Sequence, residues 1–136
     1  MALLLDTHIL LWAMDAPQLL PANVRAMLAN RGETVYFSAA SIWEIAVKSA
    51  LKKVDFDYRP DDIAETARRT GFTELPVTSD HAARVADLPH HHRDPFDRLL
   101  IAQALLLPAR FLTVDGLLVP YSDLVLLINT FANQHE

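Results

Sequence analysis

Short apolar runs recur along the chain, and each is separated from the next by a longer segment with helical periodicity. The first run is continuously apolar until it meets Asp6, as expected for a strand that is covered on both faces. Strands that alternate with helices indicate an α/β fold built on a parallel sheet. We expect strands at residues 2–6, 34–38, 72–77 and 110–114, with a weaker fifth strand at 124–128.

The segments between these runs carry signals of helix starts and ends. Asp94 followed by Pro95 is a typical helix start, and Pro108 ends the apolar run that follows. We also expect a helix directly after Asp6. The remaining breaks, at 53–59 and 89–93, are interpreted as loops rather than domain linkers. The other expected helices cover residues 21–30, 39–51, 60–70, 79–87 and 95–107.

Composition limits the number of domains and the compartment. A chain of 136 residues that is 51% hydrophobic can bury one core, so we expect a single domain over residues 1–136. The absence of cysteine excludes disulfides, thiolate metal sites and cysteine catalysis, and it favours a reducing compartment. The first residues do not resemble a signal peptide, and the longest apolar run is too short to span a membrane. A soluble, cytoplasmic protein is expected.

The net charge bears on nucleic-acid binding. Lys and Arg number 12 against 17 Asp and Glu, so the formal charge is −5. This sign argues against a protein that holds nucleic acid by charge alone. It argues less against a metal-dependent nuclease, because divalent cations bound to clustered acids reverse the local field.

Four acids fall at equivalent places in the expected fold. Asp6 ends the first strand, and Glu44 lies in the opening turns of the helix after the second. Asp97 opens the helix before the fourth strand, and Asp115 closely follows that strand. In right-handed βαβ units all four positions lie at the carboxyl edge of the sheet, where ligands bind in open α/β folds. Each acid also stands in an apolar stretch, where unpaired carboxylates are rare.

Each acid also has a purely structural explanation. Capping requires neither a common edge nor apolar flanks, so the coincidence of four acids favours a functional cluster. The structural alternatives are an N-cap at Asp6, a capping box of Ser41 with Glu44, an i,i+4 pair of Glu44 with Lys48, a helix-dipole contact of Asp97, and a turn at Asp115 and Gly116.

A cluster of carboxylates suits hard divalent cations. Mg²⁺ and Mn²⁺ prefer oxygen ligands and keep several waters, so a few carboxylates suffice for one or two ions. Such ions lower the pKa of a bound water and offset charge on a phosphate and its leaving oxygen. The chemistry that this pattern favours is phosphodiester hydrolysis.

The segments LLLDTHILLW, SAASIWEIAVK, HRDPFDRLLIAQA and LTVDGLL resemble the acidic motifs of PIN-domain nucleases, especially the VapC-like toxins of toxin-antitoxin pairs. The resemblance covers nearly the whole chain, and DPFDR followed by LLIAQA is its most specific part. It implies a three-layer α/β/α sandwich with a short parallel sheet of four to five strands. It also implies metal ligands at Asp6, Glu44, Asp97 and the more variable Asp115, with Thr7 and Thr113 as substrate-side polar neighbours that orient water or a carboxylate.

The resemblance further implies an endoribonuclease that cuts single-stranded or structured RNA and leaves a 5′-phosphate and a 3′-hydroxyl. Such proteins commonly form homodimers and are silenced by a small antitoxin, here of the VapB type. Two alternatives remain at this point. One is a catalytically silent PIN-fold interaction module, and the other is a receiver-like Mg²⁺-binding signalling domain. The receiver pairs its acids with a Lys beyond a late strand, and no Lys follows Lys53.

Two basic residues lie near the expected acids. Arg98 adjoins Asp97, and Lys48 lies one turn beyond Glu44. Both could contact the phosphates that flank the scissile bond, and both could equally be surface charges. Asp94 is interpreted as a helix cap rather than a primary ligand.

The remaining conspicuous residues have less specific interpretations. His90, His91 and His92 follow Pro89, and we expect them to form a polar loop near the mouth of the site rather than a metal site. Trp12 and Trp43 lie in apolar helical surroundings, so we expect both to pack in the core.

Overall fold

The structure is a computed structural model that describes residues 1–53 and 56–129. Part of the expected loop at 53–59 (residues 54–55), and residues 130–136 of the expected domain, lie outside the described residues. The elements are β1 (Leu3–Leu5), α1 (Thr7–Asp15), η1 (Pro17–Leu19), α2 (Ala22–Ala29), β2 (Val35–Ser38), α3 (Ala39–Ala50), α4 (Pro60–Thr70), β3 (Thr73–Leu75), α5 (Ser79–Arg84), η3 (Val85–Asp87), α6 (Pro95–Leu106), β4 (Arg110–Thr113), η4 (Gly116–Tyr121) and β5 (Val125–Leu127).

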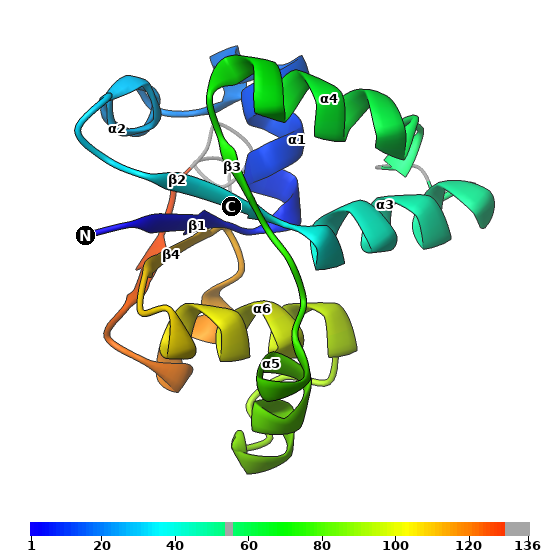
Figure 1. Ribbon diagram of the computed structural model, residues 1–136, viewed down its shortest axis with the longest axis vertical. Helices are drawn as coiled ribbons and strands as arrows, with labels where there is room; N and C mark the ends of the chain where they lie inside the picture. Colours follow the sequence, from blue (N-terminus) through cyan, green and yellow to red (C-terminus); the bar gives the residue numbers. More distant parts are fainter. Residues whose placement is uncertain (54–55, 130–136) are drawn as a thin grey trace.

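The described strands form one parallel sheet of five strands in the order β3-β2-β1-β4-β5. Strand β1 lies at its centre, where Leu3 is paired with Val35 of β2 and with Arg110 of β4 (Figure 1). The predicted α/β fold is confirmed, including the weak fifth strand. The segment expected as one helix at 79–87 is instead divided into α5 and η3, with an i to i+3 backbone bond from Leu88 to Val85.

Helices cover both faces of the sheet. Helices α1, α2 and α4 lie on one face, and α5 and α6 lie on the other (Figure 1). Because side chains alternate along a strand, Leu3 and Leu5 of β1 pack with the first group of helices and Leu4 packs with the second. Two apolar layers, one on each face, therefore join the sheet to its helices and make a three-layer sandwich.

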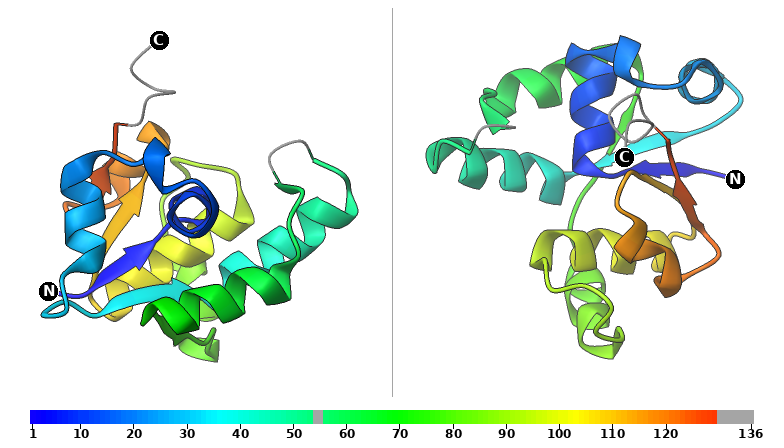
Figure 2. Two further views of the ribbon diagram at one scale, coloured as in Figure 1. Left: turned by 90° about the horizontal axis from the view of Figure 1, so that it is seen from above. Right: turned by 180° about the vertical axis from the view of Figure 1, so that it is seen from behind.

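Two connections at the carboxyl edge of the sheet are very short. Asp6 alone separates β1 from α1, and α3 begins directly after Ser38, the last residue of β2. Helix α3 continues beyond the sheet and packs between α4 and α6. Figure 2 shows α3 and α4 side by side as they extend away from the sheet. This edge therefore brings the start of α1, the start of α3 and the start of α6 together.

Among the described residues, none of the helices has the length and apolar character that crossing a membrane requires.

Candidate active site

All four predicted acids lie together at the carboxyl edge of the sheet. Burial raises the pKa of Asp97 to about 9, and the nearby negative charges of Asp6, Asp94, Glu44 and Asp115 add to this rise. Burial is the largest cause of this rise, and the four contributing charges show that the other acids lie close to Asp97. Asp94, which the sequence suggested only as a cap, is therefore a fifth member of the cluster.

Asp6 is the most deeply held of these acids. Its side chain caps α1 by accepting the backbone N–H of Thr7 at Oδ1, and Oδ2 accepts the hydroxyl of Thr113. Burial raises the pKa of Asp6 to about 6, although these two hydrogen bonds oppose the shift. The Thr113 hydroxyl also accepts the backbone N–H of Asp115 at 3.1 Å, so it connects the ends of β1 and β4.

Glu44 is buried on the inner side of α3. The Thr7 hydroxyl donates to Glu44 Oε1 at 2.6 Å and lies 2.9 Å from Ser41 Oγ. The N-cap of α3 is Ser38, which accepts the N–H of Ala40. The alternative that Ser41 and Glu44 form a capping box is therefore wrong, because Ser41 lies inside the helix and Glu44 points toward the other acids. Thr7 and Thr113, expected on the substrate side, are both buried and hold carboxylates.

Lys48 lies against the cluster. Its Nζ is 2.6 Å from Glu44 Oε2 and 3.7 Å from Asp94 Oδ2. Partial burial disfavours the ammonium, but the hydrogen bond and charge of Glu44 and the nearby acids keep the pKa of Lys48 above its usual value. The ammonium also lies 4.8 Å from the ring centroid of Phe56 and 5.7 Å from that of Phe96. The i,i+4 pair expected from the sequence is thus present and is part of the cluster.

The start of α6 presents two acids with different tasks. Asp94 is the N-cap, and its Oδ1 accepts the backbone N–H groups of Phe96 and Asp97 at 2.8 and 3.2 Å. Asp97 lies in the first turn, and its side chain is only 14% exposed. Asp94 therefore satisfies the helix end, which leaves the carboxylate of Asp97 free of capping and directed at the other acids.

His92 reaches into the same cluster, which the sequence did not predict. Its Nε2 lies 2.7 Å from Asp115 Oδ2 and 3.4 Å from Asp97 Oδ2. Among the described residues, these three form a group whose potential ligand atoms all lie within 4.8 Å of one another, close enough to hold a metal ion. His90 and His91 are exposed, as expected of a polar loop, but His92 is half-buried. The loop between η3 and α6 brings it there, and no local pattern distinguishes it from its two neighbours.

Arg98 does not point toward the acids. Its guanidinium is buried and donates to the carbonyls of Val85, Leu88 and Pro89 and to the hydroxyl of Tyr121. The expectation that Arg98 contacts a phosphate is therefore not supported, because its donors serve the loop that leads from η3 to α6. The sequence could not reveal this, since only the fold brings those carbonyls to α6.

We expect Arg98→Ala to lower the free energy of unfolding by about 2–4 kcal/mol, because it leaves several buried carbonyls without a donor. Arg98→Lys should recover only part of this loss, since one ammonium cannot reproduce the planar guanidinium. Urea denaturation of both variants measures the effect. Unchanged stability of Arg98→Ala would contradict this role.

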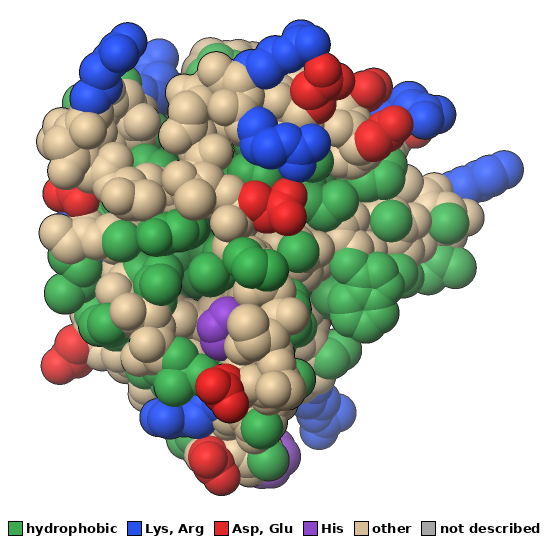
Figure 3. All heavy atoms as spheres, in the orientation of Figure 1, with side chains coloured by type: hydrophobic (Ala, Val, Ile, Leu, Met, Phe, Trp, Pro, Cys, Tyr) green, Lys and Arg blue, Asp and Glu red, His purple; other side chains and the backbone are tan. Residues whose placement is uncertain are grey.

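The expectation of core packing fails for Trp43. Its side chain is 60% exposed and meets Phe96 edge to face at 4.8 Å between ring centroids. Trp12, in contrast, is half-buried against the core. The difference arises because α3 projects past the sheet, so one of its apolar sides has no layer to cover it. Figure 3 shows hydrophobic side chains gathered over this projecting region.

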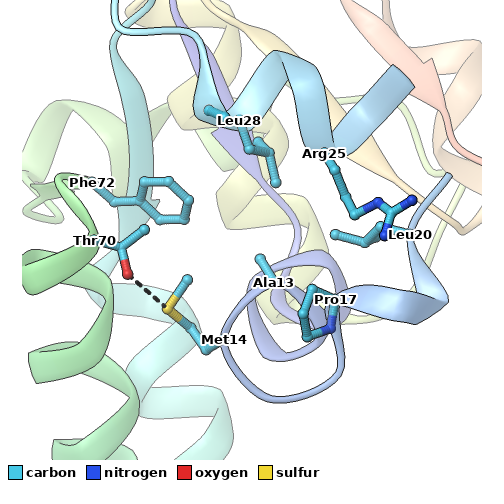
Figure 4. Close-up of a pocket in the computed structure, with 9 residues that line it drawn as sticks. Ala13, Met14, Pro17, Leu20, Arg25, Leu28, Thr70 and Phe72 are labelled. Carbon is cyan, nitrogen blue, oxygen red and sulfur yellow. Dashed lines mark hydrogen bonds between the residues drawn. The ribbon is translucent and has the colours of Figure 1, made fainter. Parts of the chain in front are cut away.

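An apolar pocket of about 220 Å³ lies away from the acids. It is formed by α1, η1, α2 and the end of α4, and its lining includes Met14, Leu28 and Phe72 (Figure 4). The hydroxyl of Thr70 faces the sulfur of Met14 there. None of the clustered acids lines this pocket, so it is separate from the candidate site.

The comparisons with known proteins agree with this arrangement. A family model described as the PIN domain matches residues 3–118. A search of curated proteins found no significant match. Among solved structures, the chain is similar to one in the crystal structure of VapBC2 from Rickettsia felis bound to a DNA fragment from its promoter. The TM-score is 0.68 and the identity 16%, over 96% of this chain and 99% of the other, which shows a shared fold.

Proposed function

The chain belongs to the PIN-domain family, and on this basis we propose that it is a metal-dependent endoribonuclease that hydrolyses RNA phosphodiester bonds as a VapC-like toxin. One observation supports this proposal above the others. Asp6, Glu44, Asp97 and Asp115 converge so closely that burial and mutual repulsion raise the pKa of Asp97 to about 9. Converging carboxylates cost stability in the ion-free protein, and a bound cation would offset that cost.

The donor set fits a hard divalent cation. Asp6, Glu44, Asp97 and Asp115 offer carboxylate oxygens, and we propose that they hold Mg²⁺ or Mn²⁺, as one or two ions. When bound, the ion would lower the pKa of a water and offset charge on the phosphate and the leaving oxygen.

The other residues of the cluster have supporting roles in this proposal. The hydroxyls of Thr7 and Thr113 orient Glu44 and Asp6, so that each carboxylate keeps one direction. Lys48 neutralises Glu44 and Asp94 in the ion-free protein, and it is the basic residue best placed to meet a substrate phosphate once cations relieve it of that task.

We extend the proposal to partners. One structural neighbour is a VapBC assembly, which supports a small antitoxin of the VapB type as the partner of this chain. The exposed apolar side of α3 is compatible with a homodimer. We propose that residues 1–136 form one domain that acts in the cytoplasm.

The alternatives are weaker. Membership of the PIN-domain family argues against the hypothesis of a receiver-like signalling domain. In a silent interaction module the four converging acids would perform no chemistry, although a cluster of buried carboxylates lowers stability unless a ligand compensates.

A metal titration with RNA cleavage as the readout tests the proposal. Mg²⁺ or Mn²⁺ should switch cleavage on, and EDTA should switch it off. Asp6→Asn should reduce the rate at least about 100-fold without unfolding the protein, because even outer-shell partners of a metal are worth 10–100-fold. Cleavage that persists in EDTA would refute the mechanism, and a folded, metal-binding protein that cuts no RNA would favour the silent module.

A further inference from the structure

The imidazole of His92 joins two acids of the proposed metal site. Its Nε2 lies 2.7 Å from Asp115 Oδ2 and 3.4 Å from Asp97 Oδ2. The residue is firmly placed, because its backbone N–H donates to the Tyr121 hydroxyl at 3.0 Å and Tyr121 also accepts from Arg98. A histidine at this place could bind a metal ion or could hold the carboxylates by donating to them.

The backbone decides between these roles. The N–H of Asp94 donates to His92 Nδ1 at 3.0 Å. A backbone N–H can only donate, so Nδ1 carries a lone pair and the ring proton resides on Nε2. Nε2–H therefore points at Asp115 Oδ2 as a donor. Binding a metal through Nε2 would require the proton to move to Nδ1, where it would meet the N–H of Asp94.

From this geometry we infer that His92 is a positioning residue, which uses its Nε2–H to hold Asp115 toward Asp97 and does not itself bind the ion. The inference rests on the proposed function, since it assigns a task at the same metal site. Asp115 needs such a partner because it lies in a turn at the start of η4 and is the most exposed acid of the four. Its Oδ1 accepts the N–H of Leu117, and the bond from His92 fixes the second oxygen.

The carboxylate of Asp115 can accept these hydrogen bonds and bind a cation at the same time. A carboxylate has about four lone-pair sites, and here two accept hydrogen bonds, so the others remain for a cation. Partners of this kind typically change metal affinity 10–100-fold when they are removed. The cost of losing His92 should therefore appear in metal binding before it appears in folding.

Two substitutions separate donation from ligation. Gln can place an amide N–H near the position of Nε2 but offers no imidazole nitrogen, whereas Ala offers neither. We expect His92→Ala to weaken Mn²⁺ binding about tenfold by calorimetry and His92→Gln to stay within about twofold of the unsubstituted protein. His90→Ala is the matched control, because His90 is exposed in the same loop and has no contact with the acids among the described residues. Thermal denaturation of the ion-free variants checks that each is folded.

Two spectroscopic readouts complete the test. Nitrogen NMR of the ion-free protein should show His92 protonated at Nε2. Electron spin-echo spectra of bound Mn²⁺ should show no signal from a coordinated nitrogen of His92, so the spectra of the unsubstituted protein and of His92→Gln should agree. A coordinated nitrogen lost in that variant, or unchanged Mn²⁺ affinity in His92→Ala, would overturn the inference. Either result overturns the inference alone, because the unsubstituted protein still binds Mn²⁺. If the unsubstituted protein binds no Mn²⁺, the proposed function itself fails, and the inference fails with it.

Discussion

Asp97→Asn should reduce RNA cleavage at least about 100-fold and yet make the ion-free protein more stable. The loss of cleavage follows from the loss of a proposed metal ligand in the middle of the cluster. The gain in stability follows from the raised pKa of Asp97, which burial and four neighbouring acids bring to about 9. We expect a gain of roughly 1–3 kcal/mol at pH 8, measured by urea denaturation in EDTA.

The stability gained by Asp97→Asn depends on pH. Between about pH 4 and pH 9 the folded state holds a proton on Asp97 that the unfolded state has released, so stability falls as the pH rises through this window. Asn never ionises and escapes this loss, so its advantage should be small near pH 4 and largest near pH 9. Asp123→Asn replaces a carboxyl group of the same kind at an exposed position and should show no such trend. An Asp97→Asn protein that is destabilised at pH 8 would contradict the assigned electrostatics.

Divalent-ion affinity should rise steeply with pH. Metal ligands must be deprotonated, and Asp97 with a pKa of about 9 holds its proton at neutral pH. Linkage then gives about a tenfold gain in Mg²⁺ affinity per pH unit from about pH 6 to pH 9, and a steeper gain below pH 6, where Asp6 with a pKa of about 6 also titrates. Calorimetry in buffers of different ionisation enthalpy should detect about one proton released per ion near pH 7.5.

Asp97→Asn provides the control for this pH dependence. It should bind Mg²⁺ more weakly, and its remaining affinity should vary little above pH 7, because the group that gives up the proton is gone. A steep pH dependence that survives in this variant would assign the released proton to another group. If the Mg²⁺ affinity of the unsubstituted protein does not change between pH 6 and pH 8.5, the raised pKa assigned to Asp97 is wrong.

The sequence predicts the placement of the acids because one rule governs it. In a parallel sheet, residues that end strands and residues that open the following helices meet at one edge, whatever the details of packing. Asp6 and Asp115 follow this rule directly, while Glu44 lies one turn into the helix after β2 and Asp97 opens the helix that leads to β4. The apolar runs around them already define these strands and helices.

Side-chain partners outside the local sequence cannot be predicted in this way. Arg98 follows Asp97 by one residue but points to carbonyls near η3, because adjacent helical residues face different directions. Trp43 has the flanks of a core residue but lies where α3 passes beyond the sheet. His92 depends on the path of a loop, and its tautomer depends on one backbone N–H.

The start of α3 also differs from one of the structural alternatives suggested by the sequence. The spacing of Ser41 and Glu44 fits a capping box, but the N-cap of α3 is Ser38, three residues before Ser41. The cause is the direct passage from β2 into α3, which turns a strand residue into the cap. That shift moves Glu44 from the helix end to the interior face and makes it available to the cluster.

The hydroxyl of Thr113 connects the ends of β1 and β4, and this connection limits insertions and deletions in these strands. It bonds to Asp6 at the end of β1 and to the N–H of Asp115 after β4, while the backbone N–H of Asp6 bonds to Leu112. One inserted or deleted codon in β4 would reverse the faces of its side chains and send this hydroxyl to the opposite layer. Insertions can therefore accumulate in the outer loops over evolutionary time, whereas the lengths of these two strands are fixed by the geometry of the acids.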